Sequence, residues 1–291
     1  MTREAGDIKS KLSKIGAEWL DTLVVAISVA MAFRAYFYEP FNIPTGSMQP
    51  TLYGNHTEEC RDAGIMQKTP LKWLNWIFTG RDYKELVAPF TGQIVYEKRN
   101  DGRFAARFYS PVHGVSKAVN LPTDVLGQLQ VSHGAYVTKG EVLWKGYDTT
   151  GDFIFVNRWL WNFRQPARGD VMIFSTTGIN GLVQGTHYIK RMTALPGETV
   201  EIIKPDVFID GRKIAPLKPM TGKRGEKTPE PEPGGMKGAF KLGEDEYFAC
   251  GDNSSNSGDS RYWGAVPGRN LRGVASCVFW PIINSRWGGI Q

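Results

Sequence analysis

One apolar segment near the N-terminus sets the first limit on what this chain can fold into. Residues 17–38 read AEWLDTLVVAISVAMAFRAYFY, with an uncharged core from Thr22 to Phe33. A helix that crosses a bilayer needs about 20 mostly apolar residues, and this segment has that length. It lacks the small-x-small cleavage site that closes a secretory leader. We therefore predict a single transmembrane anchor at 17–38, with an amphipathic soluble helix as the alternative.

Basic residues ahead of the segment predict its orientation. The four that precede it are Arg3, Lys9, Lys11 and Lys14. Cytoplasmic flanks of membrane spans carry an excess of lysine and arginine, so residues 1–16 are predicted to be a cytoplasmic segment. No second span of comparable length follows, and the chain after about residue 38 is expected to fold on the outer face.

The whole sequence has 33 glycines and 17 prolines, and nearly all of them lie after the apolar segment, where they divide the chain. Between them lie short runs rich in β-branched and aromatic residues, such as GQIVYEKR, GDFIFVNR and RGDVMIF, which favour strands. Three prolines in Glu39–Leu52 argue against a helix there and favour an extended strand that ends in a turn. The pair Asp210-Gly211 predicts a two-residue hairpin turn. Residues 218–238, rich in Pro, Gly, Lys and Glu, are expected to be an exposed loop. The predicted fold is mostly β.

Charge gives little indication of a nucleic-acid partner. The formal net charge of +6 comes from 35 basic and 29 acidic residues, and the charges are scattered along the chain. A scattered distribution indicates a solvated surface rather than a basic patch. We expect no nucleic acid among the partners.

Cysteine and histidine spacing predicts neither a disulfide framework nor a metal site. Cys60, Cys250 and Cys277 form no CxxC pair, and an odd number leaves at most one bridge. His56 and Cys60 have a spacing that can bind zinc, and His113 and His133 lie in the same stretch. No second close pair completes four ligands, so no metal and no cofactor are expected.

The residues that carry chemistry are unremarkable one at a time. Ser47 follows a glycine in a proline-rich turn, where serine is common. Lys190 has the setting of a solvated strand lysine, and GDNSSNSGDS reads as a polar loop. The information lies in five segments and their order after a candidate anchor: IPTGSMQPTL (43–52), GDFIFVNR (151–158), RGDVMIF (168–174), YIKRMTALPGE (188–198) and GDNSSNSGDSRYWG (251–264).

In these segments the chain resembles the bacterial type I signal peptidases, also called leader peptidases. The resemblance covers residues 17–52 and 151–291. It implies a β catalytic domain built from 39–52 plus 151–291. Residues 53–150 lie outside it and are predicted to be an inserted small β module of unknown role, which enters the chain beside the nucleophile segment.

The resemblance implies a serine protease with Ser47 as nucleophile and Lys190 as general base. A lysine accepts a proton only when it is neutral, yet its ordinary pKa is about 10.4. Burial among apolar groups disfavours the charged form and lowers that pKa. Arg191 is no substitute, because a guanidinium stays charged. Neighbours on a strand point to opposite faces, so Arg191 is expected to face away from Lys190.

Supporting roles are also implied by the resemblance. The oxyanion donors are the backbone N–H of Ser47 and the hydroxyl of Thr45, where the family often has serine. Ser257 is expected to hydrogen-bond and orient the lysine. Two charged pairs near the site are assigned structural roles: Asp259 with Arg261, and Asp252 with Arg191. Ser254 and Ser255 stand where the family commonly has Arg-Asp, which leaves the role of those charges open.

The implied substrates are exported preproteins, cut after small-x-small sequences such as Ala-x-Ala. Six apolar residues are predicted to line the shallow substrate pockets: Ile43, Pro44, Met48, Leu52, Tyr188 and Ile189. The alternative is that some of them, Leu52 above all, fill the core. An extended substrate would pair by strand addition with the segments that carry Ser47 and Lys190. The implied location is the bacterial cytoplasmic (inner) membrane, with the catalytic domain on the periplasmic face. The partners are signal peptides, the lipid bilayer and, as a further candidate, the secretion machinery.

Competing interpretations remain open at this point. One is a soluble Ser/Lys protease of the repressor-cleaving type, which shares the β fold but follows a DNA-binding domain. Another is a catalytically silent membrane protein that binds preproteins or envelope partners. A Ser/His/Asp triad that uses His187 is a third, although Lys190 occupies the base position.

The tryptophan-rich segments also allow two interpretations. Trp73, Trp76 and Phe78 either touch the membrane interface or form the core of the inserted module. Trp159 and Trp161, after the second matching segment, present the same choice.

Overall fold

The structure is a computed structural model that describes residues 2–60, 64–99, 104–112, 114–122, 125–203, 206–214 and 238–290. The loop predicted at 218–238 lies outside the described residues except for Gly238, and His113 lies outside them as well.

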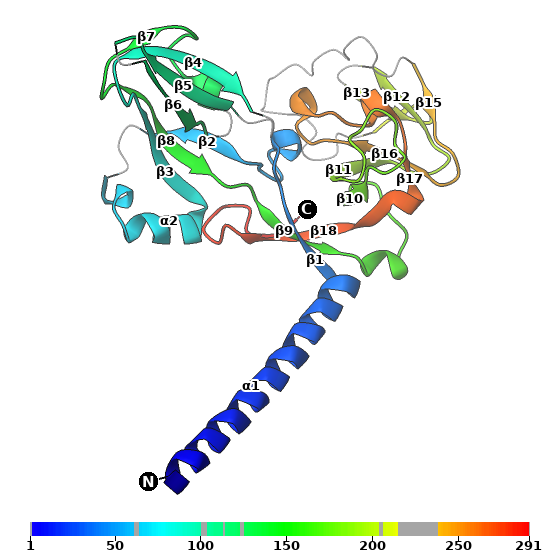
Figure 1. Cartoon of the computed structure of the whole chain (residues 1–291). Coiled ribbons are helices and arrows are strands. Elements are labelled where there is room, and N and C mark those ends of the chain that lie inside the picture. The colour runs from blue at the N-terminus through cyan, green and yellow to red at the C-terminus, as the bar shows by residue number, and fades with distance from the viewer. Residues whose placement is uncertain are drawn as a thin grey trace.

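The N-terminal segment forms one long helix, α1 (Thr2–Tyr36), which projects from the remainder of the molecule (Figure 1). Its C-terminal half, Glu18–Tyr36, is long and apolar enough to cross a membrane, with a mean hydropathy of 1.4 and none of it buried. No proline interrupts residues 2–36, and Pro40 follows in an extended segment where a helix cannot continue. The helix therefore begins well before the predicted anchor at 17–38 and ends just inside it.

An eight-stranded antiparallel sheet forms the centre of the molecule. In spatial order its strands are β1 (Tyr38–Asn42), β9 (Phe153–Asn157), β18 (Leu271–Trp280), β10 (Val171–Ser175), β11 (His187–Ala194), β16 (Glu246–Cys250) and β17 (Val266–Pro267), with β19 (Gly288–Gly289) paired to β18. The sheet is assembled from residues on both sides of the 53–150 segment. The predicted mostly-β fold is confirmed.

A smaller sheet follows β11. It has the order β14 (Arg212–Lys213), β13 (Asp206–Ile209), β12 (Thr199–Ile203) and β15 (Phe240–Lys241). The hairpin predicted at Asp210-Gly211 joins β13 to β14, and both turn residues have positive φ, 50° and 73°. Glycine tolerates that conformation freely and aspartate more readily than most residues, which is why this pair signals the turn.

Residues 56–149 build two sheets of their own. One has the order β2 (His56–Glu59), β8 (Val142–Thr149) and β3 (Arg81–Val87). The other has the order β6 (Val115–Asn120), β5 (Phe104–Ser110), β4 (Gly92–Lys98) and β7 (Tyr136–Val137). No described strand of this inserted module pairs with the eight-stranded sheet, and Figure 1 shows it as a separate lobe. Phe108, Ile94 and Trp144 are buried in its own core.

The tryptophan-rich segment forms helix α2 (Leu71–Thr79), which ends at Gly80 with a φ of 71°. None of its residues is buried. The interpretation of Trp73, Trp76 and Phe78 as the core of the module is therefore wrong, because that core lies between the strands. Trp161 packs partly buried against the main core, whereas Trp159 is exposed.

The remaining short elements among the described residues are α3 (Ser260–Trp263) and the 3-10 turns Gly46–Met48, Gly64–Gln67, Val125–Gln128, Leu160–Asn162, Ser254–Asn256 and Gly268–Asn270. The first of these follows β1. It rests on a core cluster in which Ile43, Met48 and Leu52 pack against strands β9, β10 and β18.

Candidate active site

Ser47 sits in the 3-10 turn Gly46–Met48, directly after the extended segment that follows β1. The side chain of the next residue, Met48, is fully buried, and the N–H of Leu52 donates to the Met48 carbonyl at 2.9 Å. These contacts fix the turn from below. Ser47 itself is 7% exposed, so its hydroxyl lies at the edge of the core.

Lys190 reaches Ser47 from strand β11, 143 residues further along the chain. Its Nζ donates to Ser47 Oγ at 2.8 Å and to the Ile189 carbonyl at 3.0 Å. The lysine is 4% exposed. A nucleophilic hydroxyl within hydrogen-bond reach of a buried amine is the geometry that a nucleophile and its base require.

Burial sets the protonation of Lys190. It lowers the pKa of the ammonium from 10.5 to about 8, while the carboxylates of Asp259 and Asp252 act to raise it. A fraction of the lysine is therefore neutral near pH 7–8, which a base needs.

Both acidic residues near the lysine are neutralised by arginines. Asp252 is fully buried and receives two bonds from Arg191, each of 2.8 Å. Asp259 is also fully buried and receives 2.7 and 2.8 Å bonds from Arg261. Because each acidic residue forms a bidentate pair with an arginine, the net charge near Lys190 is small. Desolvation therefore has the largest effect on the pKa of Lys190. Arg191 thus points to Asp252 while Lys190 points to Ser47.

Thr45 lies two residues before the nucleophile and is exposed. Its hydroxyl donates to Ser47 Oγ at 3.5 Å, the outer limit of a hydrogen bond. The Thr45 hydroxyl is thus close to Ser47 Oγ, and its hydrogen bond to that oxygen is weak.

The hydrogen bond expected from Ser257 to Lys190 is absent. Ser257 Oγ is buried and has no hydrogen-bond partner within the described part of the chain. The hydroxyl lies over Gly251 instead: a Cβ added to Gly251 would sit 2.1 Å from it. The amine of Lys190 is occupied by Ser47 and the Ile189 carbonyl.

The loop after β16 holds the nucleophile turn through contacts that the sequence did not indicate. Asn253 donates its backbone N–H to the Ser47 carbonyl and its side-chain amide to the Gly46 carbonyl, both at 3.0 Å. A Cβ on Gly251 would come within 2.5 Å of the Ser47 carbonyl oxygen. The fifth matching segment marks this loop, but no local pattern singles out Asn253.

The two serines that depart from the family pattern contribute differently. Ser254 is buried, and its carbonyl accepts a 2.9 Å bond from Arg261. Ser255 is exposed and donates to the side chain of Asn253 at 3.1 Å. The backbone at Ser254 therefore helps to hold Arg261 against Asp259.

Only half of the six predicted pocket residues are accessible. Pro44 is exposed, and Tyr188 and Ile189 are half-buried beside the dyad. Ile43, Met48 and Leu52 are buried in the core beneath the nucleophile turn. The prediction that these three line an open pocket is not met in this structure, because the strands behind the turn cover them.

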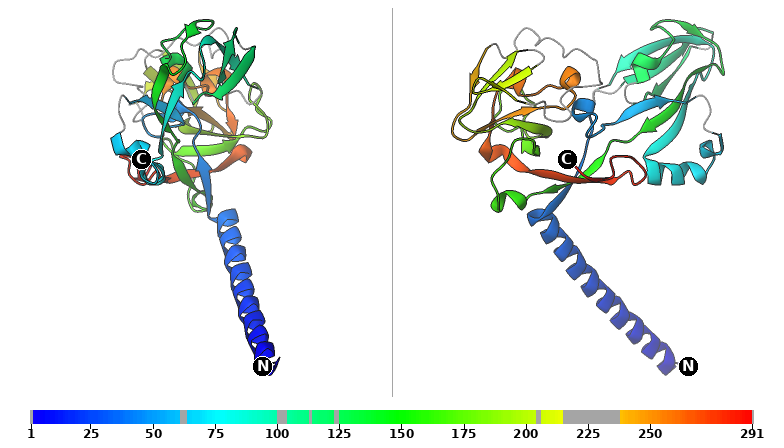
Figure 2. Two further views of the ribbon diagram at one scale, coloured as in Figure 1. Left: turned by 60° about the vertical axis from the view of Figure 1, so that its left-hand side comes forward. Right: turned by 180° about the vertical axis from the view of Figure 1, so that it is seen from behind.

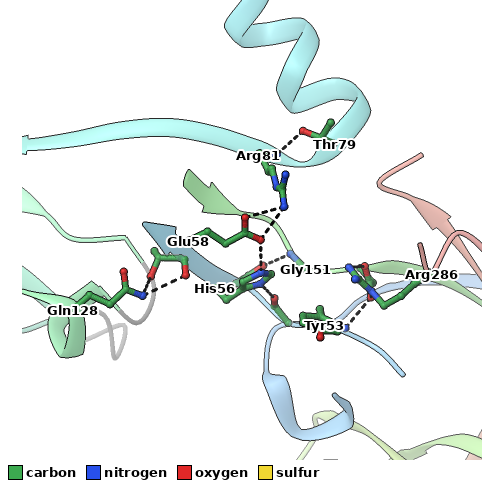
Figure 3. Close-up of polar contacts among 12 residues, drawn as sticks. Tyr53, His56, Glu58, Thr79, Arg81, Gln128, Gly151 and Arg286 are labelled. Atoms are coloured by element: carbon green, nitrogen blue, oxygen red, sulfur yellow. Dashed lines mark hydrogen bonds and ion pairs between the residues drawn. The ribbon is translucent and has the colours of Figure 1, made fainter. Parts of the chain in front are cut away.

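The inserted module joins the catalytic part at its two ends, where Figure 3 shows the polar contacts of Tyr53, His56, Gly151 and Arg286. Asp152 is fully buried and accepts 2.8 and 2.9 Å bonds from Arg286 and a 2.8 Å bond from the N–H of Tyr53. The Arg286 guanidinium lies over the Tyr53 ring at 4.1 Å. The two ends of the module are thus tied to each other and to the C-terminal segment.

His56 takes part in this junction. Its ring contacts the Gly54 carbonyl at 2.8 Å and Glu58 at 3.2 Å, and the Glu58 hydrogen bond raises its pKa. The described residues contain no group of three acidic, cysteine or histidine side chains that could hold a metal ion. Cys60, Cys250 and Cys277 are not joined to one another by a disulfide in the structure.

His187 is exposed at the start of β11, where its ring lies 5.5 Å from that of Phe41 on β1. Ser47 Oγ is hydrogen-bonded to Lys190 Nζ instead, so the geometry favours a Ser/Lys dyad over a Ser/His/Asp triad.

Comparisons with known proteins agree with this arrangement. A family model described as signal peptidase, peptidase S26, matches residues 148–280. Signal peptidase I P from Bacillus subtilis subsp. natto is 34% identical over 155 residues, which make up 52% of this chain and 78% of that protein. The chain belongs to the signal peptidase family, peptidase S26. The resemblance seen in the five segments is confirmed at this level.

Other relatives are matched over smaller parts of their length. Probable signal peptidase I-2 from Synechocystis sp. is 30% identical over 132 residues, or 45% of this chain. The chain spans between 56% and 66% of the length of three such relatives, less than two thirds. A crystal structure of a signal peptidase I from Enterococcus faecalis covers 39% of this chain and 98% of its own, at 26% identity. Its TM-score of 0.30 is too low to support an argument about the fold.

The family match includes Lys190, the predicted base, but not Ser47, the predicted nucleophile. Residues 148–280 contain Lys190, both charged pairs and Ser257, whereas Ser47 lies before the inserted module. The tertiary structure brings Ser47 to the matched part, through the 2.8 Å contact.

Proposed function

We propose that this chain is a membrane-anchored signal peptidase. It is an endopeptidase that removes N-terminal signal peptides from exported preproteins after small-x-small sites, with Ser47 as nucleophile and Lys190 as general base. The observation that carries the proposal is the 2.8 Å contact between two buried groups, Lys190 Nζ and Ser47 Oγ. The lowered pKa of Lys190, about 8, supports the role of base.

The reaction proceeds in two halves. Neutral Lys190 accepts the Ser47 proton while Oγ attacks the scissile carbonyl, which gives a tetrahedral oxyanion. The Ser47 N–H and the Thr45 hydroxyl donate to that oxygen as charge develops. The C–N bond then breaks, and the Lys190 ammonium gives its proton to the leaving amine. In the second half, Lys190 takes a proton from water as the water oxygen attacks the acyl-enzyme carbonyl. The bond from that carbon to Ser47 Oγ then breaks, and the Lys190 ammonium returns the proton to Oγ, which regenerates the hydroxyl and the neutral amine.

Open strand edges support a binding mode for an extended substrate. β11 pairs with β10 over His187–Arg191 but with β16 only from Arg191 onward. His187–Lys190 thus has a second edge with no strand partner among the described residues. β1 is the terminal strand of the sheet, and its ring contact from Phe41 to His187 brings it opposite this open edge. A substrate strand that lies between them pairs through its backbone.

The same segments account for a preference for small side chains. Pro44, Tyr188 and Ile189 flank the dyad, and the buried side chains of Ile43, Met48 and Leu52 close the space behind it. A shallow apolar surface backed by buried side chains admits alanine. A larger substrate side chain would have to displace the packed core residues behind the surface, which costs free energy.

Anchoring completes the proposal. α1 crosses the cytoplasmic membrane of a bacterium once, and the catalytic domain lies on the outer, periplasmic face. Its partners are signal peptides and the bilayer, and the secretion machinery is a further candidate. The apolar, unburied stretch Glu18–Tyr36 supports this assignment.

The test is cleavage of a preprotein with an Ala-x-Ala signal by the detergent-solubilised full chain. Ser47→Ala and Lys190→Met should each abolish cleavage, whereas Ser116→Ala, which replaces an exposed serine on β6 of the inserted module, should cleave at the native rate. His187→Ala should retain activity, which separates the lysine dyad from a histidine triad. Absence of cleavage by the native chain would favour the silent binding protein and sink the proposal.

A further inference from the structure

Helix α2 of the inserted module exposes an apolar surface. Of its nine residues, Trp73 is 67% exposed, and Leu74, Trp76, Ile77 and Phe78 are each more than 40% exposed. A soluble protein that left five large apolar side chains together in water would carry an aggregation hazard. The helix is capped at Gly80. The carbonyls of its C-terminal turn accept hydrogen bonds from the catalytic part, which hold the helix in place.

Helix α2 contacts the end of strand β18 and the segment that follows it. Trp280 Nε1 donates to the Ile77 carbonyl at 2.7 Å, and the Ile283 N–H donates to the Phe78 carbonyl at 2.9 Å. The rings of Trp76 and Trp280 meet at 5.7 Å. Ile282, Ile283 and Trp287 beyond them are exposed as well. α2 and residues 282–287 together form one surface, which we call the α2 patch.

A continuous series of ring contacts joins the α2 patch to the anchor. Each ring touches the next at centroid distances between 4.2 and 6.3 Å. The series, from helix α1 to helix α2, is Phe33, Tyr38, Phe155, Phe279, Phe153, Trp280 and Trp76. The anchor and the insert are thus connected by aromatic side chains across one edge of the sheet.

The α2 patch and the anchor lie toward the same end of the molecule. In Figure 1, α2 is at the base of the inserted module, at about the level of β9 and β18, and α1 leaves below them. The views in Figure 2 agree: from behind, α2 again lies on the side from which α1 departs. A bilayer that holds α1 therefore lies on the side of the molecule where α2 is exposed.

We propose that helix α2 lies in the interface of the phospholipid bilayer that α1 crosses, so that the inserted module rests on the membrane through the α2 patch. The inference rests on the proposed anchoring by α1. Tryptophan is enriched at the headgroup level of membranes, where its ring is buried and its N–H stays wet. Lys68, exposed just before α2, suits anionic headgroups, whereas Lys72 within the helix is paired with Asp82 at 3.1 Å.

A lipid occupant fits better than a second protein. The bilayer is already next to the patch once α1 is inserted, whereas a soluble partner would have to enter the space between the patch and the headgroups. The module is tied to the catalytic part at Asp152–Arg286 and through the α2 hydrogen bonds to Trp280 and Ile283. Contact of α2 with lipid would add a further support for its position beside the catalytic sheet.

Spin-label depth measurements test the inference in the full chain. In a background with Cys60→Ser, Cys250→Ala and Cys277→Ala, one nitroxide is attached at a time in phosphatidylethanolamine/phosphatidylglycerol vesicles. Three positions carry it: Leu74→Cys in α2, Val24→Cys in α1, and Lys117→Cys on the exposed strand β6. Collisions with oxygen report lipid, and collisions with a water-soluble nickel chelate report water.

The Leu74 label should collide with nickel at least roughly threefold less than the Lys117 label, and with oxygen more, because the interface excludes the chelate. Trp73→Glu should return the Leu74 label to water. Tyr136→Glu, which replaces an equally exposed aromatic residue on β7, should leave the label in lipid.

Three results would overturn the inference. A Leu74 label as accessible to nickel as the Lys117 label, with Val24 in lipid, removes the α2 contact and leaves the anchor intact. A Val24 label in water removes the anchoring and the α2 contact together. A Leu74 label shielded from both reagents, with dipolar broadening between copies, means that a second chain covers the patch instead of lipid.

Discussion

At the scale of single residues, the proposed role of Lys190 as a base requires that its buried amine can be neutral. Lys190 is buried, which disfavours its charge, and the nearby carboxylates act in the opposite direction. Arg191 and Arg261 offset those carboxylates through bidentate pairs. The balance of burial and pairing, rather than any one group, leaves the lysine able to accept a proton.

The pH dependence of cleavage follows from that pKa. Because the neutral amine is the active form, kcat/KM for a soluble Ala-x-Ala peptide should rise about tenfold per pH unit below pH 8 and level off above it. The measurement is a rate profile from pH 6 to 10 in detergent. A profile that is flat over this range would show that a different group acts as the base.

Loss of Arg261 should move that profile. With Arg261→Gln, the buried Asp259 charge is no longer offset and raises the pKa of Lys190, so the midpoint shifts to higher pH. The double variant Asp259→Asn with Arg261→Gln removes both charges and should bring the midpoint back. A change in rate with an unchanged midpoint would mean that Arg261 acts on geometry alone.

Thr45 should matter through its hydroxyl. Thr45→Val keeps the shape but removes the donor, and loss of an oxyanion donor lowers kcat by about 100- to 1,000-fold in other proteases. Thr45→Ser retains the donor and should stay within about fivefold of the native rate. Single-turnover cleavage measures both variants, and equal rates for valine and threonine would exclude the hydroxyl from the oxyanion site.

At the scale of elements, the nucleophile turn is held between two layers. The core side chains of Met48 and Leu52 support it from below, and the loop after β16 holds it from above through Asn253. Contact between that loop and the turn is possible only because residue 251 has no side chain.

Gly251→Ala should therefore disrupt the site. The added methyl would lie 2.5 Å from the Ser47 carbonyl oxygen and 2.1 Å from Ser257 Oγ, so the loop must move away from the nucleophile. We expect at least roughly a 100-fold loss of kcat, since displacements of about 1 Å have effects of that size. Gly258→Ala on the same loop, where an added Cβ has no neighbour within 4 Å, is the matched control and should be active. Equal activity of the two variants would contradict the tight fit at Gly251.

At the scale of the whole molecule, the inserted module is structurally separable from the catalytic sheet. Its strands form two sheets with their own core, and its ends meet because His56 lies opposite Thr149 in the β2–β8 pair. The junction at Asp152 and Arg286 lies outside the excised strands.

Replacement of residues 56–149 by a short glycine linker should therefore leave the catalytic sheet folded. We expect cleavage of a soluble peptide within about threefold of native, because neither the dyad nor its supports come from the module. Thermal unfolding in detergent and peptide cleavage measure the two expectations. A chain that no longer melts cooperatively would show that the module is part of the catalytic core.

Much of this protein could be predicted from the sequence, because the signals are local. An apolar stretch of bilayer length, the turn pair Asp210-Gly211 and the strand runs bounded by glycine depend on neighbouring residues. The five segments that pointed to Ser47, Lys190 and the family are local patterns of the same kind.

Other features depended on contacts across the chain that no local pattern encodes. Only the tertiary structure decided that Ser257 Oγ has no hydrogen-bond partner among the described residues and that Asn253 holds the nucleophile turn. It also decided that Met48 and Leu52 are core and that α2 is a helix with no buried residue. Burial and long-range pairing decided these points, because the same residue type is a solvated side chain or a buried one according to what packs against it.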